Sequence, residues 1–251
     1  MPRPSAAGMK SADFAAVYDK FKATVSRFDC GRFCAPLNNG DPVCCSTQHA
    51  VPVVDKAEFT LLKSRTDLWH VFKPYDAPTR QIVAELHKSC MAIECKGARH
   101  CERDNRSIAC RAFPFYPYLT RAGEFVGLGT YWTYEDRCWL ISNMRVVERE
   151  FVAEFVAAYE YIFARDPEEY TTMKAHSAAH RRVFTRRGEP IPLIGRKGGF
   201  LQVLPGSGGH IVPLPPSQLP RFGAYVSHAA YGKAVQAAGG DPAPAVAALK
   251  L

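Results

Sequence analysis

Residues 30–45 read CGRFCAPLNNGDPVCC, and this stretch decides how the rest of the chain is interpreted. It holds four cysteines together with two glycines, two prolines and two asparagines, a composition typical of a loop. A loop suits a metal site, because several thiolates can converge without helical or strand periodicity setting their directions. The stretch therefore predicts a metal site built on irregular structure.

The chain of 251 residues contains nine cysteines, and all of them lie between residues 30 and 138. Small secreted proteins use such a density for disulfides. Here the count is odd, the chain is long, and its first residues lack the apolar stretch of a secretory leader. We therefore expect metal or redox chemistry in the cytoplasm, with disulfides and unrelated buried thiols as the alternatives.

A second cysteine-rich stretch reads CKGARHCERDNRSIAC in residues 95–110. Neither stretch contains the C-x2-C pair that structural zinc sites usually use. Iron–sulfur clusters such as [4Fe–4S] accept wider spacings, so we expect an iron–sulfur cluster, with zinc as the alternative. The predicted metal ligands are Cys30, Cys34, Cys44, Cys45, Cys95, Cys101, Cys110 and Cys138.

Nearby positive charge would balance the negative charge of several thiolates at one metal centre. Five arginines lie close to the cysteines in the sequence: Arg32, Arg99, Arg103, Arg106 and Arg111. We expect Arg111 to contact the cofactor. For any single arginine, the alternative is a solvated position on the surface.

These motifs resemble those of the YkgJ-type cysteine-cluster proteins, a family described as zinc- or iron-chelating. The resemblance rests on C-x3-C followed by a Cys-Cys pair, and on a cysteine nine residues before the run C-R-x-F-P. It covers roughly residues 28–140, with a wider gap before the Cys-Cys pair than the family has. The matching positions are Cys30, Cys34, Cys44, Cys45, Cys101, Cys110, Arg111, Phe113 and Pro114, with Cys138 in the place of a further downstream cysteine. The resemblance implies a metal-chelating domain.

The predicted fold is mainly helical with one small β-hairpin, an α+β arrangement in which irregular cysteine-rich loops join the helices. Apolar residues at three- and four-residue steps predict helices at 11–28, 55–65, 78–93, 146–165 and 167–182. The hairpin is expected between residues 114 and 134, around Gly123. Cys90 would lie on the apolar face of helix 78–93, as either a core residue or a ligand.

Residues 188–251 differ in composition, since they hold 20 of the 37 glycines and prolines. We therefore predict two units, a helical cysteine-cluster metal-binding domain at 1–187 and a Gly/Pro-rich arm or subdomain at 188–251. The second unit is expected to carry one helix near 221–237 and to end in a loose Ala/Pro-rich terminus.

The chain carries 32 Lys and Arg against 24 Asp and Glu, a net charge of +8. The run from Lys174 to Arg187 holds five basic residues and no acid. It predicts a basic face for another protein, whereas no RNA-binding signature supports nucleic acid. His176 and His180, four residues apart on a predicted helix, are expected at the surface, with a pair of metal ligands as the alternative. No stretch is long and apolar enough to span a membrane.

Two functions remain open. In the first, the chain is an enzyme or enzyme subunit that uses a metal centre on a protein or a metabolite. In the second, it is a non-catalytic, metal-stabilised module that binds a protein or nucleic acid. An open coordination position or a redox-active cluster would distinguish the enzyme from a closed structural site. The sequence names no substrate and no oligomeric state.

Overall fold

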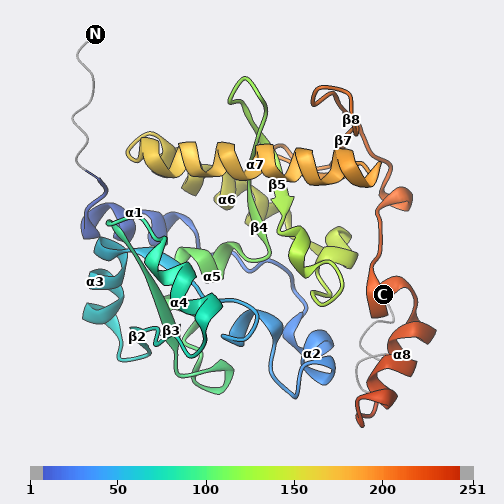
Figure 1. The fold of residues 1–251 in the computed structure, drawn as a ribbon, viewed down its shortest axis with the longest axis horizontal. Coiled ribbons are helices and arrows are strands. Elements are labelled where there is room, and N and C mark those ends of the chain that lie inside the picture. Colours follow the sequence, from blue (N-terminus) through green and yellow to red (C-terminus); the bar gives the residue numbers. More distant parts are fainter. Residues whose placement is uncertain (1–7, 244–251) are drawn as a thin grey trace.

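A computed structural model describes residues 8–243, which form helices and two antiparallel sheets (Figure 1). The helices are α1 (Ser11–Lys20), α2 (Gly31–Cys34), α3 (Lys56–Arg65), α4 (Ala77–Ala84), α5 (Ile108–Ala112), α6 (Arg149–Phe163), α7 (Pro167–Arg187) and α8 (His228–Ala237). The strands are β1 (Val53–Asp55), β2 (Trp69–Val71), β3 (Cys90–Cys95), β4 (Phe115–Leu119), β5 (Phe125–Thr130), β6 (Ile191–Gly195), β7 (Phe200–Val203) and β8 (Ile211–Pro213). Short 3-10 turns occupy much of the remaining chain.

Local signals set the ends of the longer helices. α3 begins where the Asp55 side chain accepts a hydrogen bond of 2.6 Å from the Ala57 amide. α7 begins where the Asp166 side chain accepts from two amides of the first turn, and it ends at Gly188. The φ of Gly188 is 68°, a left-handed conformation that glycine adopts without strain. No helix within residues 8–243 has the length and apolarity needed to cross a bilayer.

The main core lies where α1 packs against α3 and α6. α6 repeats its apolar residues at helical spacing, so its buried face presents Phe151, Phe155 and Ile162 to this core. β3 is the central strand of the small sheet, in the order β1-β3-β2. The strands of this sheet follow the first cysteine-rich stretch in the sequence and lead into the second, and β2 and β3 lie on the side away from α7 in Figure 1.

The larger sheet has the order β4-β5-β6-β7-β8, and α7 packs on β4 and β6. In Figure 1, α7 runs the length of the molecule across this region. A second, smaller core lies between the sheet and α7, and its buried residues are Tyr116, Tyr118, Phe184, Ile191, Leu193 and Val203. The predicted boundary between residues 187 and 188 falls between α7 and β6, and β6 pairs with β5.

The predicted fold class was wrong in its β content. The expected hairpin exists as β4 and β5, but it forms one edge of a five-stranded sheet whose other three strands come from residues 191–213. These strands are only three to five residues long, and Pro192 interrupts the usual strand pattern. Pro192 is tolerated because β6 pairs with β5 only at Ile194 and Gly195.

Two predicted helices are shorter than expected, and the residues that follow each of them are not helical. Helix 11–28 ends at Lys20, and helix 78–93 ends at Ala84. Cys90 therefore lies at the start of β3 rather than on a helix. The last part of the predicted loose terminus, residues 244–251, lies outside the described residues.

Candidate metal centre

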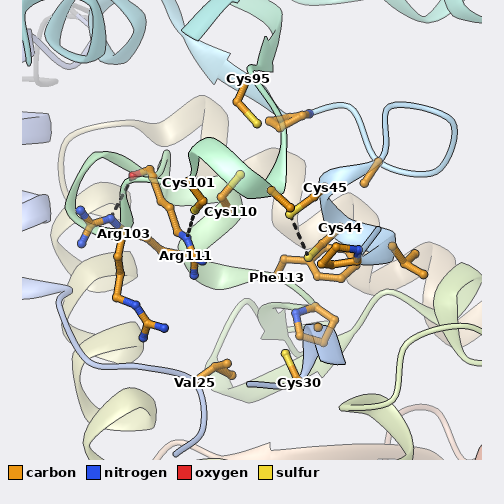
Figure 2. Close-up of a pocket in the computed structure, with 18 of the residues that line it drawn as sticks. Val25, Cys30, Cys44, Cys45, Cys95, Cys101, Arg103, Cys110, Arg111 and Phe113 are labelled. Atoms are coloured by element: carbon orange, nitrogen blue, oxygen red, sulfur yellow. Dashed lines mark hydrogen bonds between the residues drawn. The ribbon is translucent and has the colours of Figure 1, made fainter. Parts of the chain in front are cut away.

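All eight predicted ligands line one cavity of about 180 Å³, here called the cysteine cavity (Figure 2). They come from segments far apart in the sequence: the loop at residues 30–45, the end of β3, the loop that leads into α5, and the segment after β5. All nine cysteines of the chain are free thiols. The sequence placed these thiols in two loops, and the fold brings the two loops to the same cavity.

The first loop is held in shape by tight turns. Cys30 precedes α2 and Cys34 ends it, while Cys44 and Cys45 lie in the 3-10 turn Val43–Cys45. A Cβ atom at Gly31 would lie 2.9 Å from Cγ of Pro42, so glycine lets the two halves of the loop meet. The Sγ atoms of Cys44 and Cys45 are 4.0 Å apart.

Aromatic stacking attaches the segment of Cys138 to this loop. Phe33 precedes Cys34, Trp139 follows Cys138, and the rings of Phe33 and Trp139 stack with centroids 4.2 Å apart. Both cysteines are buried beside these rings. Two segments about a hundred residues apart in sequence are thus joined by side-chain packing rather than by a regular element.

Side-chain hydrogen bonds hold the second loop. The Trp69 indole nitrogen donates to the Asn105 carbonyl at 2.7 Å, which ties the loop to β2. The Ser107 hydroxyl accepts from the Cys110 amide at 3.2 Å and begins α5, which aims Cys110 into the cavity. Nε of Arg106 donates to Sγ of Cys101 at 3.0 Å. Arg106 is therefore the arginine in direct contact with a thiol.

Burial and the surrounding thiols shift the pKa values of the cysteines in the cavity. Burial raises the pKa of the Cys138 thiol, and Cys30 and Cys34 raise it further. Burial likewise raises the pKa of Cys110 to about 12, with a further contribution from Cys45.

The vicinal pair lies between these two neighbourhoods. The pKa of Cys95 is affected by Cys45 and Cys101, whereas that of Cys44 is affected by Cys45, Cys30 and Cys34. A hydrogen bond from Cys44 lowers the pKa of Cys45 to about 7, although burial opposes this shift. One thiol of the pair is thus readily ionised while the other stays protonated.

Arg111 lines the cavity, as Figure 2 shows, but its guanidinium is occupied by the fold. It donates to the backbone carbonyls of Phe21, Arg106 (3.0 Å) and Asp104 (2.6 Å). It also lies over the Tyr18 ring, 4.5 Å from the centroid. Arg111 therefore ties the second cysteine loop to the end of α1.

Cys90 lines a different, neighbouring cavity and does not line the cysteine cavity. Its Sγ lies 3.7 Å from the Ser89 hydroxyl. Within the described residues, Cys90 is the cysteine that the fold separates from the other eight.

The donor chemistry of the cavity fits a soft metal or an iron–sulfur cluster, which thiolates bind and carboxylates do not prefer. As they stand, no three His, Cys, Asp or Glu side chains among residues 8–243 lie close enough to hold a metal ion. The thiols would have to turn toward one another around a metal.

The two histidines of α7 are not a metal pair on the surface. His180 is fully buried, which contradicts the expected surface position, and its Nδ1 lies 2.7 Å from the Tyr116 hydroxyl. His176 is partly buried and stacks on Trp132. The sequence signal that could have shown this is the aromatic pair Tyr116 and Tyr118, which packs against that face of α7.

Comparison of the chain with protein-family models, with curated proteins and with solved structures found no match. The site is therefore interpreted from its own residues.

Proposed function

We propose that this chain is a metal-binding protein whose cysteine cavity holds an iron–sulfur cluster, with zinc as the alternative metal. The observation that carries the proposal is that eight free thiols from four segments line one cavity. In a reducing compartment, such convergence is far more typical of metal ligation than of disulfide formation. The motif resemblance to the YkgJ-type cysteine-cluster proteins, including the run Cys110 to Pro114, supports the same interpretation.

We further propose that the eight thiols form two groups of four, each suited to one four-coordinate zinc or to one cluster bound by four thiolates. The proposed groups are Cys30, Cys34, Cys44 and Cys138, and Cys45, Cys95, Cys101 and Cys110. Cys45 lies at the boundary between them, because it also raises the pKa of Cys34 and Cys44. The adjacent residues Cys44 and Cys45, whose Sγ atoms are 4.0 Å apart, would then lie where the two groups meet and serve different centres. Arg106 would offset the negative charge of the second group.

The proposed role of the centre is in an enzyme or enzyme subunit acting on a protein or metabolite. The chemistry supplied by a bound iron–sulfur cluster is electron transfer, or substrate coordination at an open iron. The alternative is a closed structural site in a non-catalytic module. For either role, we propose that the protein acts in the cytoplasm. X-ray absorption at the metal edge distinguishes the two roles by the presence or absence of non-protein ligands.

The proposal is tested by purifying the full chain without oxygen and measuring its visible spectrum together with iron, sulfide and zinc. We expect a brown protein with equal amounts of iron and sulfide. A colourless protein with stoichiometric zinc overturns the iron–sulfur assignment. A metal-free protein overturns the metal centre altogether.

Two variants test the grouping of the ligands. Cys138→Ser should halve the metal content, because it removes a ligand of one group only. Cys90→Ser is the matched control and should retain all of the metal, since Cys90 lies outside the cysteine cavity. Equal loss in both variants would show that the metal does not occupy the cysteine cavity.

A further inference from the structure

A second cavity lies directly beside the cysteine cavity, and its volume of about 660 Å³ is that of a small-molecule site. The two cavities share the residues Cys44, Ala50, Pro52, Cys110 and Phe113 in their linings. Most of the wall is apolar or aromatic, with Phe14, Tyr131 and Tyr159 among its residues.

The charge of this second cavity is opposite to that of the whole chain. Five carboxylates line it: Asp55, Glu58, Glu85, Asp166 and Glu169. Among the described residues of the lining there is no lysine and no arginine, although the chain has a net charge of +8. We call it the acidic cavity.

Three of the five carboxylates already have structural partners. Asp55 and Asp166 accept hydrogen bonds from the first amides of α3 and α7. Glu85 accepts from the side-chain amide of Gln81 at 2.8 Å. The presence of these three carboxylates is therefore explained by contacts within the protein and does not require a ligand.

Glu58 and Glu169 are different, because their charge is incompletely matched. Oε1 of Glu58 accepts from the Tyr18 hydroxyl and from the Ile108 amide, both at 2.7 Å. Its other oxygen has no hydrogen-bond partner among the described residues, although Glu58 is only 3% exposed. The Glu169 side chain makes no hydrogen bond or ion pair within residues 8–243.

The charge of Glu58 also acts on Glu169, which lines the same cavity. Burial raises the pKa of Glu169 to about 7, with Asp166 and Glu58 adding to the shift. Burial likewise raises the pKa of Glu58 to about 7, where Asp55 adds to the shift and Arg111 opposes it. A cation placed near buried or partly buried carboxylates stabilises their charged forms.

We propose that the acidic cavity binds a small organic cation, an amine with an aromatic or aliphatic body, between Glu58 and Glu169. The apolar wall would cover the body of the ligand, and aromatic rings such as Tyr131 and Tyr159 suit a cationic group. The proposal does not rest on the metal, and its failure would leave the metal centre untouched. A ligand bound there would lie against the wall formed by Cys44 and Cys110.

The test uses three probes of one shape: 4-phenylbutylamine, 4-phenylbutanol and 4-phenylbutyrate. Their binding to the purified full chain is measured by calorimetry at pH 8, where both glutamates are ionised and the amine is still a cation. We expect the amine to bind at least tenfold more tightly than the alcohol, and the carboxylate not to bind. An alcohol that binds as tightly as the amine, or no binding by any probe, overturns the proposal.

Glutamine variants locate the site. Glu169→Gln loses no intramolecular hydrogen bond and should reduce the preference for the amine over the alcohol at least threefold. Adding Glu58→Gln should remove the preference while the affinity for the alcohol persists, which also shows that the cavity is still formed. Glu124→Gln, at the exposed turn between β4 and β5, is the matched control and should keep the full preference. A full preference in the double variant would place the amine elsewhere and overturn the proposal.

Discussion

The cysteine cavity and the acidic cavity share a wall, but they are built from different kinds of structure. Loops and short turns line the first, and its charged side chains are mixed: Lys22, Arg103, Arg106 and Arg111 face Asp29, Glu94 and Asp104. The first turns of α3 and α7 contribute to the second, whose described lining has five carboxylates and no lysine or arginine. The positions of the cysteines therefore depend on loops, whereas the positions of most of the carboxylates depend on where helices begin.

Helix ends explain why acids gather at the acidic cavity, but not why Glu58 is buried and Glu169 is partly buried. Carboxylates are favourable at helix N-termini, where they accept hydrogen bonds from the free amides. Asp55 and Asp166 fill that role. Glu58 and Glu169 also lie in the first turn of each helix, but neither accepts a hydrogen bond from the amides of that helix. The unexplained part of the acidity is therefore confined to these two glutamates.

The largest difference between the two cavities is expected when the proposed metal is removed, because only the loops of the cysteine cavity should then lose their structure. Thiolate-bound metal contributes on the order of 10 kcal/mol to the folding of small sites. If the cysteine cavity holds the proposed metal, removing it with a chelator should expose the amides of residues 30–45 and 95–110 to hydrogen exchange, while α6 and α7 remain protected. Hydrogen exchange measured by mass spectrometry checks this. Equal protection with and without metal would show that the loops do not depend on it.

Much of the helical structure could be predicted from the sequence, because its signals are local. α6 and α7 follow the apolar period and the capping Asp166 closely. β6, β7 and β8 could not, since each is short and gains its stability only from strands distant in the sequence. A short apolar run beside glycine and proline looks the same in an irregular arm and in a sheet.

The same distinction applies to the candidate site. The thiols were predictable because cysteine itself is the signal. The convergence of the two loops was not predictable, because it depends on contacts between distant residues, such as Phe33 with Trp139 and Trp69 with Asn105. Arg111 was expected beside the cofactor, and that expectation is untested, but its three bonds to backbone carbonyls reveal a structural role that spacing alone does not disclose.

A second, smaller effect concerns Glu58 and the dependence of stability on pH. The pKa of Glu58 is raised from 4.5 to about 7, so the folded state binds a proton more tightly than the unfolded state. The protonated Glu58 therefore contributes about 3 kcal/mol to the free energy of unfolding, relative to its ionised form. This contribution is complete below pH 4.5 and is lost as the pH rises through about 7. Glu58→Gln keeps an acceptor for Tyr18 and Ile108 and should remove this loss. Urea unfolding at pH 5 and pH 8 checks it.

In that experiment the wild type should lose stability relative to Glu58→Gln as the pH rises. Glu124→Gln serves as the control, because Glu124 is exposed, and it should follow the wild type. Parallel pH dependence of the wild type and Glu58→Gln would contradict a buried, protonated Glu58.

A third effect concerns a buried hydrogen bond outside both cavities, between Tyr116 and His180. Its loss serves as a reference, because it should affect stability but not metal binding. Tyr116→Phe removes the 2.7 Å hydrogen bond to His180, whose Nε2 already lacks a partner within the described residues. The free energy of unfolding should fall by about 1–2 kcal/mol, with metal content unchanged. Denaturant unfolding measures this. A drop in metal content instead would mean that the sheet and the cysteine cavity are coupled.

The smallest effects are expected at the basic residues of α7, where the structure divides the predicted basic face in two. Arg181 donates to the Tyr118 hydroxyl and the Leu119 carbonyl, and Arg187 pairs with Glu135 at 2.9 Å. Arg182 and Arg186 are exposed and make no ion pair among residues 8–243. A partner protein with an acidic surface would therefore meet mainly these two arginines.

Charge reversal can separate the structural arginines from those that are free to bind. Arg182→Glu with Arg186→Glu should change stability by less than about 0.5 kcal/mol, because exposed charges without partners contribute little. Arg181→Glu with Arg187→Glu should cost about 1–2 kcal/mol, because both hydrogen-bonded contacts are lost. Urea unfolding of both double variants, compared at low and high salt, measures the difference. If the two pairs cost the same, the contacts of Arg181 and Arg187 contribute nothing, and all four arginines are equally available to a partner.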